Sequence, residues 1–591
     1  VQDAVARRTA QLSEPARRLV AVAAVSGRRF DFSLLQAVTG ADEAALVGQV
    51  KELLAAQLVV EVSADAFAFR HALTRQAVYA ALLTRERRAL HHAVALSLEA
   101  APSPPPSGEL SLHFFAAEDW EQALTYARQA GDHARDLYAP RAAVEHYTRA
   151  LEAASRRGLA PAELWRARGQ MAQTLGEYTT AQTDYEQALR LAQAAGDLRA
   201  EWQARLDLGF LWAAHDYARA GEYLDQALQL ARRLDDPALL AHSLNRVGNW
   251  HANIEQPAEA RRCHAEALRL FEALADQAGV AATLDLLGIA SYIAGDSFQG
   301  VAYYERAVAL FRALGDRGGL VSSLMMYSTR GADYLGRTAV PAPSRLSDRL
   351  RDGEEALRLA LEIDARPAEA LGQIWVGLSC AIAGEYGRAL ELIRSGLALA
   401  EIMDHRHFLA TGNLVLGALY ADLLAWPAAQ THLEQALSLG RATHSLVWTR
   451  VAAGFLASVL IQQGQLDQAE AVLANLFTPD LPMEAVGQRQ LWFARAELAL
   501  AKGEPRSALE IIERLAASAP NAAGAHSVPA LALLRGAALA ALGRSAEAEQ
   551  TWQAALAVAQ ACELPPLVWR LDLALSRLFL AAGRRDAAAE A

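Results

Sequence analysis

Histidines, cysteines and acids are the residues of this chain that could do chemistry, and their spacing forms no catalytic or metal-binding motif. The closest groupings are three pairs: His405 with His407, Cys263 with His264, and His91 with His92. The first two pairs have no further ligands at the spacing of zinc sites, and the third lies in an arginine-rich segment without carboxylate partners. The Gly-x-Ser-x-Gly sequence of serine hydrolases is also absent. We therefore expect a protein that is not an enzyme and whose chain binds no cofactor or metal by itself.

Composition and charge narrow the possible classes of protein further. The chain has 591 residues and a formal net charge of −11, which disfavours the concentrated basic face that nucleic-acid binding needs. No apolar stretch of about 18 residues is free of charge, so we expect no membrane span. The N-terminus lacks the layout of a signal peptide, and the three widely spaced cysteines fit a reducing compartment. We expect a cytoplasmic protein that contacts neither nucleic acid nor membrane directly.

A pattern of small and large residues recurs along most of the chain. It is clearest where Gly169 and the turn residue Gly176 are followed by Ala181, Tyr185 and Ala188. The position of Ala181 returns at 220, 260, 300, 389, 429, 469, 508, 548 and 588, with steps of 39 or 40 except between 300 and 389. That longer step contains one further copy, with its alanine at 356, and an insertion. Such a period predicts a repeat architecture.

Paired helices explain the pattern. A small residue on the first helix of each hairpin, helix A, lets helix B cross closely, and the turn glycine ends helix A in the left-handed conformation. The small and large positions resemble those of the tetratricopeptide repeat (TPR), whose usual period is about 34. We expect an all-α fold, a right-handed α–α superhelix of about 13 TPR-like repeats over 108–591. An insertion near 328–352 interrupts it, and its last repeat is cut short.

The first hundred residues break the period and predict a separate small domain. Helices are expected at 13–25, 31–38, 42–56, 71–83 and 85–100, and strands at 58–62 and 66–70. Ser13 and Pro15 are typical of a helix N-terminus. Three helices followed by a hairpin predict a winged-helix domain over 1–100, and the proline-rich stretch 101–107 predicts a linker.

Three segments of this domain carry a more specific resemblance: LSEPARRLVAVAAVSGRRFDFSLLQAVTG, LLAAQLVVE and FAFRHALTRQAVYAALLTRERRALHHAVALSLE. They resemble the winged helix of bacterial STAND signal-transduction NTPases, the class of large ATP-binding LuxR-type, MalT-like regulators. In that class a nucleotide-binding domain precedes the winged helix and a helical-repeat sensor follows it. The resemblance implies ATP or ADP in the full-length protein, although this chain has no Gly-x-x-x-x-Gly-Lys-Ser/Thr loop and no LuxR-type helix-turn-helix.

His71 is the residue to which the resemblance gives the most definite role. In STAND relatives a histidine at the start of this segment contacts the β-phosphate of bound ADP and keeps the protein inactive. We therefore expect His71, with Arg70 beside it, to contact ADP when the nucleotide-binding domain is present. The alternative is a surface or helix-capping histidine without a ligand. The predicted recognition helix at 42–56 is acidic and lacks base-reading arginines, so we expect it to pack within the protein and not on DNA.

Polar and aromatic residues gather on the predicted A helices in the first half of the array. Because A helices normally line the concave surface of a solenoid, these residues are candidates for a ligand or partner groove. They are Arg166, Gln170, Gln173, Asn245, Asn249, Trp250, Asp285, Tyr292 and Met325. The asparagines could equally satisfy buried backbone groups or face solvent. The insertion at 328–352 could lie on the binding face or form a plain surface loop.

These features together predict the sensing arm of a STAND-type regulator. An inducer, either a small molecule or a protein or peptide, would bind the concave face. Binding would act through the winged helix on the protein's own nucleotide-binding domain and release an ADP-locked inactive state. Two alternatives are a plain TPR scaffold that docks a partner's peptide, and a sensor joined to a cyclase or kinase output.

Overall fold

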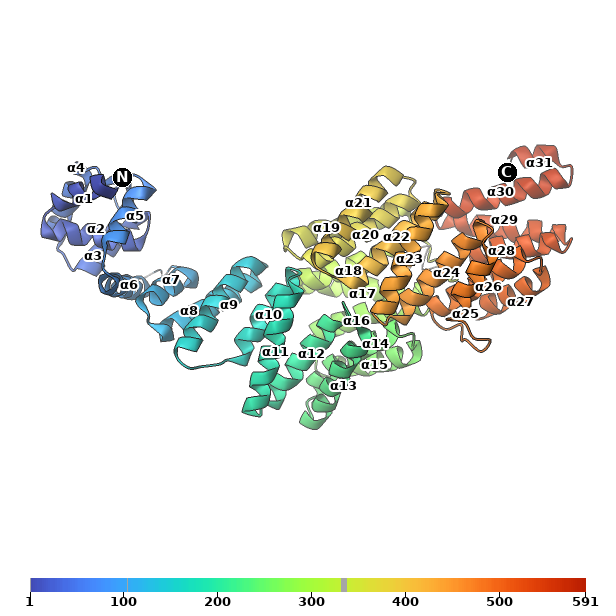
Figure 1. Ribbon diagram of the computed structural model, residues 1–591, viewed down its shortest axis with the longest axis horizontal. Coiled ribbons are helices and arrows are strands. Elements are labelled where there is room, and N and C mark those ends of the chain that lie inside the picture. Colours follow the sequence, from blue (N-terminus) through green and yellow to red (C-terminus); the bar gives the residue numbers. More distant parts are fainter. Residues whose placement is uncertain (1, 102, 104, 331–336, 591) are drawn as a thin grey trace. The chain divides into compact units, whose positions relative to one another are not determined.

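Alanine- and leucine-rich segments form helices along the whole chain in the computed structural model (Figure 1). The structure describes residues 2–101, 103, 105–330 and 337–590. The chain divides into two compact units, 1–172 and 173–591. Over the described residues, no helix has both the length and the apolar character needed to cross a membrane.

The N-terminal part of the first unit combines helices with a small sheet. In chain order its elements are α1 (Gln2–Ala10), α2 (Glu14–Ser26), β1 (Arg29–Asp31), α3 (Phe32–Thr39), α4 (Glu43–Ala55), β2 (Val59–Ser63), β3 (Ala66–Phe69), α5 (Ala72–Ala81) and α6 (Thr84–Glu99). The predicted helices and hairpin are present, whereas α1 and β1 were not predicted. The sheet is antiparallel with the order β1-β3-β2, and Phe30 lies opposite Phe67.

Local sequence and one apolar core fix these elements. Ser13 caps α2, since its hydroxyl accepts a hydrogen bond from the Ala16 amide at 3.3 Å. The strand alternation of β3 puts Phe67 and Phe69 on one face, where both rings contact Phe30. The helices complete this core with Leu19, Leu35, Leu46 and Leu53.

Helical hairpins form the rest of the chain. The earlier helices are α7 (Ser107–Ala117), α8 (Trp120–Asp136), α9 (Pro140–Arg156), α10 (Ala162–Thr174), α11 (Tyr178–Ala195), α12 (Leu198–Trp212), α13 (Tyr217–Leu234), α14 (Pro237–Asn253), α15 (Pro257–Ala273), α16 (Gln277–Ile293), α17 (Ser297–Leu314) and α18 (Arg317–Thr329). The later ones are α19 (Leu346–Glu362), α20 (Arg366–Ile382), α21 (Tyr386–Ile402), α22 (Arg406–Asp422), α23 (Trp426–Ala442), α24 (Leu446–Gln462), α25 (Leu466–Ala474), α26 (Val486–Ala501), α27 (Pro505–Ala517), α28 (Pro529–Ala541), α29 (Ser545–Ala561), α30 (Pro565–Ala581) and α31 (Arg585–Glu590), with the short 3₁₀ helix η1 (Ala525–Ser527) before α28. Consecutive helices pack on each other, which confirms the prediction of an all-α array of TPR-like repeats.

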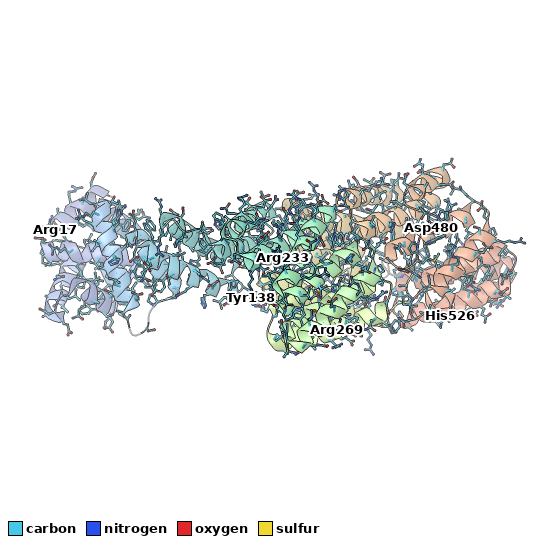
Figure 2. The ribbon with its side chains drawn as sticks, turned by 90° about the horizontal axis from the view of Figure 1, so that it is seen from below. Arg17, Tyr138, Arg233, Arg269, Asp480 and His526 are labelled. Atoms are coloured by element: carbon cyan, nitrogen blue, oxygen red, sulfur yellow. The ribbon has the colours of Figure 1, made fainter. Side chains whose placement is uncertain are left out.

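A glycine on helix A lets helix B approach closely in several hairpins. Gly288 of α16 faces the ring of Tyr304 of α17, and a Cβ atom at Gly288 would lie 2.5 Å from that ring. The same arrangement recurs at Gly248 with His264, Gly377 with Ile393, Gly417 with Leu433, and Gly536 with Trp552. The B helices present charged side chains to the outer surface, such as Arg233 of α13 and Arg269 of α15 (Figure 2).

Several A helices end at a left-handed residue, as the turn glycines predict. Gly295, after α16, has a φ of 79°. The equivalent residue after α14 is Glu255, with a φ of 58°. Residues with a side chain are uncommon in this conformation, so surrounding contacts must hold Glu255 there.

Those contacts come from a later part of the second unit. Residues at the turns after α12, α14 and α16 form hydrogen bonds with residues 190 to 228 positions further along the chain. We call these contacts the seam; its members are Asp216, Tyr217, Glu255 and Asp296 on one side and His407, His444, Arg450 and Asn521 on the other. Glu255 and Arg450 form a buried ion pair in it. The seam therefore joins two stretches of the array that are distant in sequence.

Two of the seam contacts are made by histidine side chains. The Tyr217 hydroxyl and His407 Nδ1 are 3.1 Å apart, and His444 Nδ1 lies 3.0 Å from an Asp216 carboxylate oxygen. Burial lowers the pKa of His407 to about 4 and lowers the pKa of nearby His405 well below its usual value. Both imidazoles are therefore neutral at pH 7.

The insertion differs from its predicted extent. α18 ends at Thr329 and α19 begins at Leu346, so the last part of the predicted range 328–352 is helical. Residues 331–336 of that range lie outside the described residues. Residues 337–345 do not form a plain surface loop, because the buried Arg489 side chain donates hydrogen bonds of 3.1 and 2.6 Å to the Thr338 carbonyl. This part of the insertion is anchored against α26.

Candidate ligand pocket on the A-helix face

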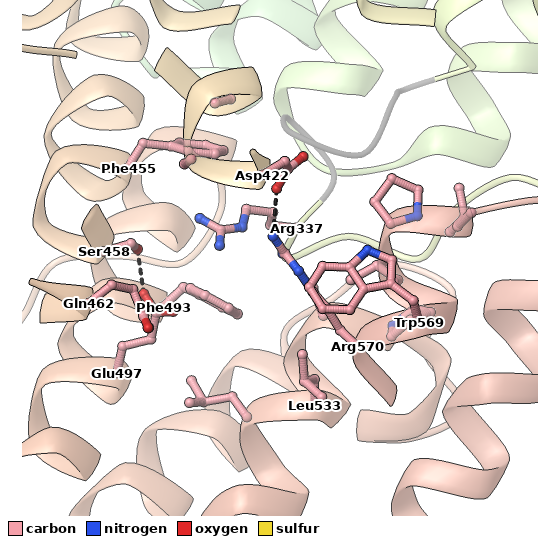
Figure 3. Close-up of a pocket in the computed structure, with 18 of the residues that line it drawn as sticks. Arg337, Asp422, Phe455, Ser458, Gln462, Phe493, Glu497, Leu533, Trp569 and Arg570 are labelled. Atoms are coloured by element: carbon pink, nitrogen blue, oxygen red, sulfur yellow. Dashed lines mark hydrogen bonds and ion pairs between the residues drawn. The ribbon is translucent and has the colours of Figure 1, made fainter. Parts of the chain in front are cut away.

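A cavity in the second unit lies on the face formed by its A helices (Figure 3). Six alternate helices line it: α20, α22, α24, α26, α28 and α30. The anchored insertion contributes Arg337 and Pro341. The cavity has a volume of about 550 Å³ and a mainly apolar wall, to which Leu378, Leu419 and Leu533 contribute. We call this cavity the pocket.

Arg337 places a cation inside the pocket. Its guanidinium carbon lies 4.6 Å from the centre of the Phe455 ring and 5.1 Å from that of Phe493. Figure 3 shows the guanidinium directed into the cavity between these rings. Burial lowers the pKa of Arg337, whereas the Glu497 carboxylate raises it. Arginine keeps its proton in such surroundings, and the ring faces stabilise its charge.

Glu497 supplies a carboxylate on the wall formed by α26. One of its oxygens accepts a hydrogen bond from the Ser458 hydroxyl of α24. Burial raises the pKa of Glu497, and the cations of Arg337 and Arg570 partly oppose this rise. Although Glu497 and Arg337 act on each other electrostatically, the described residues show no ion pair between them. The pocket thus contains a cation and an acid that a ligand could engage separately.

A second arginine spans the pocket. Arg570 of α30 forms an ion pair of 2.6 Å with Asp422 of α22, two helices that are far apart in the sequence. The guanidinium of Arg570 also lies 5.3 Å from the ring centre of Trp569, which is 44% exposed. Because its charge is matched by Asp422, Arg570 shapes the wall, whereas Arg337 has no ion-pair partner among the described residues.

Several groove residues predicted from the sequence are packing residues. Asn245, Tyr292 and Met325 are buried. The Asn245 amide donates a 2.7 Å hydrogen bond to the Thr283 hydroxyl and its oxygen lies 3.2 Å from His264 Nδ1, so it links neighbouring hairpins. The prediction that these three residues line an open groove was wrong, because neighbouring helices cover them: Tyr292 packs against Tyr304 of α17, and Met325 packs against Gly372 of α20.

The other predicted groove residues are more accessible. Arg166 and Gln170, on α10, and Asn249, on α14, are partly exposed. Gln173 accepts a 2.8 Å hydrogen bond from the Tyr185 hydroxyl. Trp250 donates to the Tyr217 carbonyl at 2.7 Å and lines a smaller cavity of about 250 Å³ beside α13. None of these residues lines the larger pocket.

Asp285 belongs to a polar strip on the early A helices. It accepts hydrogen bonds from the hydroxyls of Ser323, at 2.7 Å, and Ser322, at 3.2 Å. Burial raises the pKa of Asp285 to about 6, and Arg246 opposes this rise. The guanidinium of Arg246 in turn lies 4.0 Å from the centre of the Phe210 ring. The strip is thus satisfied by its own residues.

Arg70 and His71 are exposed between β3 and α5. His71 is the N-cap residue of α5, but its side chain makes no capping hydrogen bond. The Arg70 backbone amide donates to the Leu58 carbonyl at 3.1 Å, which leaves its side chain at the surface. The role of this pair toward a nucleotide stays a prediction.

The histidine pair in α6 has partners that the sequence analysis missed. His92 lies 3.4 Å from an Asp119 carboxylate oxygen, so the prediction that the pair lacks carboxylate partners was wrong. His91 Nδ1 lies 3.0 Å from His113 Nδ1, and its Nε2 lies 2.9 Å from the Tyr79 hydroxyl. Burial lowers the pKa of both His91 and His113 to about 4. Nowhere in the described chain do three or more His, Cys, Asp or Glu side chains gather as a metal site would require.

The pocket residues were not predicted from the sequence, for two reasons. Arg337 comes from the insertion, and the other residues come from repeats whose A helices looked uniformly apolar. Ser458 and Glu497 are separated by 39 residues and so occupy equivalent positions of neighbouring repeats. Comparing equivalent positions of successive repeats would have revealed Ser458 and Glu497 as polar residues among apolar ones. It would not have revealed that they lie close to Arg337.

Comparison with known proteins identifies the repeat. The tetratricopeptide repeat family matches residues 162–194, and no curated protein matches the chain. Similar solved structures include a STAND protein with a tetratricopeptide repeat sensor from Pyrococcus horikoshii (13% identity, 78% of this chain and 66% of that chain, TM-score 0.41). Another is the APC/C hetero-tetramer Cut9–Hcn1 (14% identity, 85% of this chain and 88% of that chain, TM-score 0.46). A third is a Rap protein complexed with Competence and Sporulation Factor (13% identity, 60% of this chain and 99% of that chain, TM-score 0.41). The chain spans just under two thirds of the STAND protein's length.

The consecutively packed hairpins show an all-α array of TPR-like repeats, and the family match covers one repeat of it, over residues 162–194. Within this array, the pocket combines a ligand-sized volume with the partly buried charges of Arg337 and Glu497.

Proposed function

We propose that this chain is the effector-sensing arm of a STAND-type signal-transduction regulator. The observation that carries the proposal is the pocket on the A-helix face, where six A helices and the anchored insertion surround about 550 Å³. Ligand pockets commonly have volumes of about 300–1,000 Å³, mainly apolar walls and a few polar groups. A TPR-like array with such a pocket is suited to binding an effector, either a small molecule or a short segment of a protein.

The N-terminal domain would transmit the binding event. The proposal is supported by a three-stranded sheet packed with helices in this domain, and by the exposure of Arg70 and His71, which leaves them available to a neighbouring domain. In this proposal they contact ADP in the protein's nucleotide-binding domain and stabilise the inactive arrangement. An effector that binds the active arrangement more tightly would then shift the population toward it.

His71→Ala tests the coupling in a protein that contains this chain and its nucleotide-binding domain. We expect the variant to release ADP faster and to raise output without effector, because it removes a hydrogen-bond donor to the β-phosphate. ADP retention after gel filtration and basal reporter output would be measured together. His133→Ala, at an exposed histidine of α8, is the matched control and should behave like the unmodified protein.

A plain TPR scaffold would give a different result. In that case His71→Ala and His133→Ala would both leave nucleotide retention and basal output unchanged. The same outcome would contradict the proposed role of His71.

A further inference from the structure

The Arg337 guanidinium lies close to two aromatic rings and has no hydrogen-bond acceptor among the described residues. Its carbon lies over the rings of Phe455 and Phe493, and aromatic rings cannot accept the full set of hydrogen bonds that the five guanidinium N–H donors can form. No described residue accepts a hydrogen bond from this side chain or forms an ion pair with it. Arg337 is partly buried, and removing guanidinium donors from water is costly unless a ligand or water accepts hydrogen bonds from them. Arg337 therefore has a positive charge and hydrogen-bond donors with which to bind an anionic group of a ligand.

The charges of the wall favour a negative ligand with a single charge. The lining contains three arginines, Arg337, Arg570 and Arg577, and two acids, Asp422 and Glu497. Asp422 is already paired with Arg570. Glu497 lies close enough to influence Arg337 electrostatically, and it would repel a second negative charge on a ligand held there. A monoanion suits this arrangement better than a dianion such as a phosphate monoester.

The rest of the wall favours an apolar ligand body. Apolar side chains predominate around the cavity, including Leu378, Leu419, Phe493 and Leu533. Trp569 stands at the wall with a partly exposed ring. A body several carbons long, or an aromatic ring, would displace water from this surface and contribute the hydrophobic part of the affinity.

We propose that the effector of this pocket is an organic monocarboxylate. Its carboxylate pairs with the edge of Arg337, and its apolar body lies along Phe455, Phe493 and Leu533. The inference rests on the proposed function and adds the chemical class of the effector. A bidentate pair between carboxylate and guanidinium fixes the head group, and the apolar wall selects the body.

Three probes with the same body and different head groups test the class: phenylhexanoate, phenylhexanol and phenylhexylamine. Their dissociation constants for the purified chain would be measured by isothermal titration calorimetry. We expect phenylhexanoate to bind about tenfold more tightly than the alcohol, because it adds charge-assisted hydrogen bonds. The amine should bind more weakly than the acid. Equal binding of acid and alcohol, or no binding of the acid, contradicts the inference.

Two pocket variants test whether Arg337 and Glu497 cause the preference for the acid. Arg337→Gln should abolish the preference for the acid while leaving the binding of the alcohol within about twofold. Glu497→Gln should tighten the binding of the acid and weaken that of the amine, because it removes a neighbouring negative charge. Arg514→Gln is the matched control, since Arg514 lies over the Trp492 ring at 4.8 Å and outside the pocket. A preference for the acid that survives Arg337→Gln contradicts the inference.

Failure of this inference is distinguishable from failure of the proposed function. Tighter binding of the alcohol would reject the monocarboxylate but keep the pocket as an effector site. The proposed coupling fails separately, when His71→Ala leaves nucleotide retention and output unchanged. Thermal unfolding of each variant without ligand shows whether a loss of binding reflects a loss of fold.

Discussion

The Tyr304 ring occupies the space that a Cβ atom of Gly288 would need, and comparable pairs occur in other hairpins. Residues of this kind were predictable from the sequence, because both partners lie within one repeat. The same is true of Gly295, whose left-handed conformation follows from its position in the turn. Arg337, in contrast, carried no signal of its own. Its role arises from Phe455 and Phe493, which lie more than a hundred residues further along the chain.

Gly288→Ala tests the packing at the residue scale. The added methyl group would force Tyr304 to shift, and we expect the free energy of unfolding to fall by about 1–3 kcal/mol, as for other overpacked cores. Urea denaturation followed by circular dichroism measures the change. Gly387→Ala on α21 is the matched control, since no atom lies within 4 Å of the added Cβ. It should raise the stability by about 0.5–1 kcal/mol through helix propensity. Equal effects of the two substitutions would refute this account of the hairpin.

At the scale of elements, turns and loops do more than connect helices. The turn after α14 holds Glu255 in a left-handed conformation and pairs it with Arg450 of α24. The fully buried Arg489 of α26 holds the insertion through the Thr338 carbonyl and also donates to Leu515 O at 2.8 Å. Hydrogen bonds from one charged side chain thus fix the segment that carries Arg337. Neither contact follows from helix periodicity, because each joins a loop to a distant repeat.

The seam predicts a loss of stability in mild acid. Burial gives His407 a pKa of about 4 in the folded chain, against its usual 6.5. Between these pH values the unfolded chain binds a proton that the folded seam does not, so the contribution to stability is present above about pH 6.5 and declines as the pH falls toward 4. A protonated imidazole could also no longer accept a hydrogen bond from Tyr217 through Nδ1.

His407→Gln should make this decline shallower, because glutamine does not titrate. The free energy of unfolding would be measured in urea at pH 7 and pH 5 for the variant and the unmodified chain. His526→Gln, at an exposed histidine before α28, should leave the pH dependence unchanged. An identical pH dependence in the His407 variant and the unmodified chain would rule out His407 as a source of the effect.

At the scale of the whole molecule, the first unit and the array differ in how far sequence alone describes them. The helices and the hairpin of the N-terminal domain were predictable from caps and alternation. The array's hairpins were predictable from their period, but the seam and the pocket bring together residues of repeats that are far apart in the sequence, which the period does not specify. Tyr292 and Met325, predicted to line a groove, are buried, while Glu497 and Leu533 line the pocket.

The central claim is that the pocket of the second unit holds the effector. Leu533→Trp would fill the pocket, whereas Leu361→Trp adds the same side chain at an exposed position of α19. Both variants and the unmodified chain would be incubated with a small-molecule extract of cells, and the compounds they retain would be identified by mass spectrometry. We predict that the unmodified chain and Leu361→Trp retain a common compound that Leu533→Trp does not retain. Retention of the same compounds by all three proteins, or of none by any, would contradict the claim.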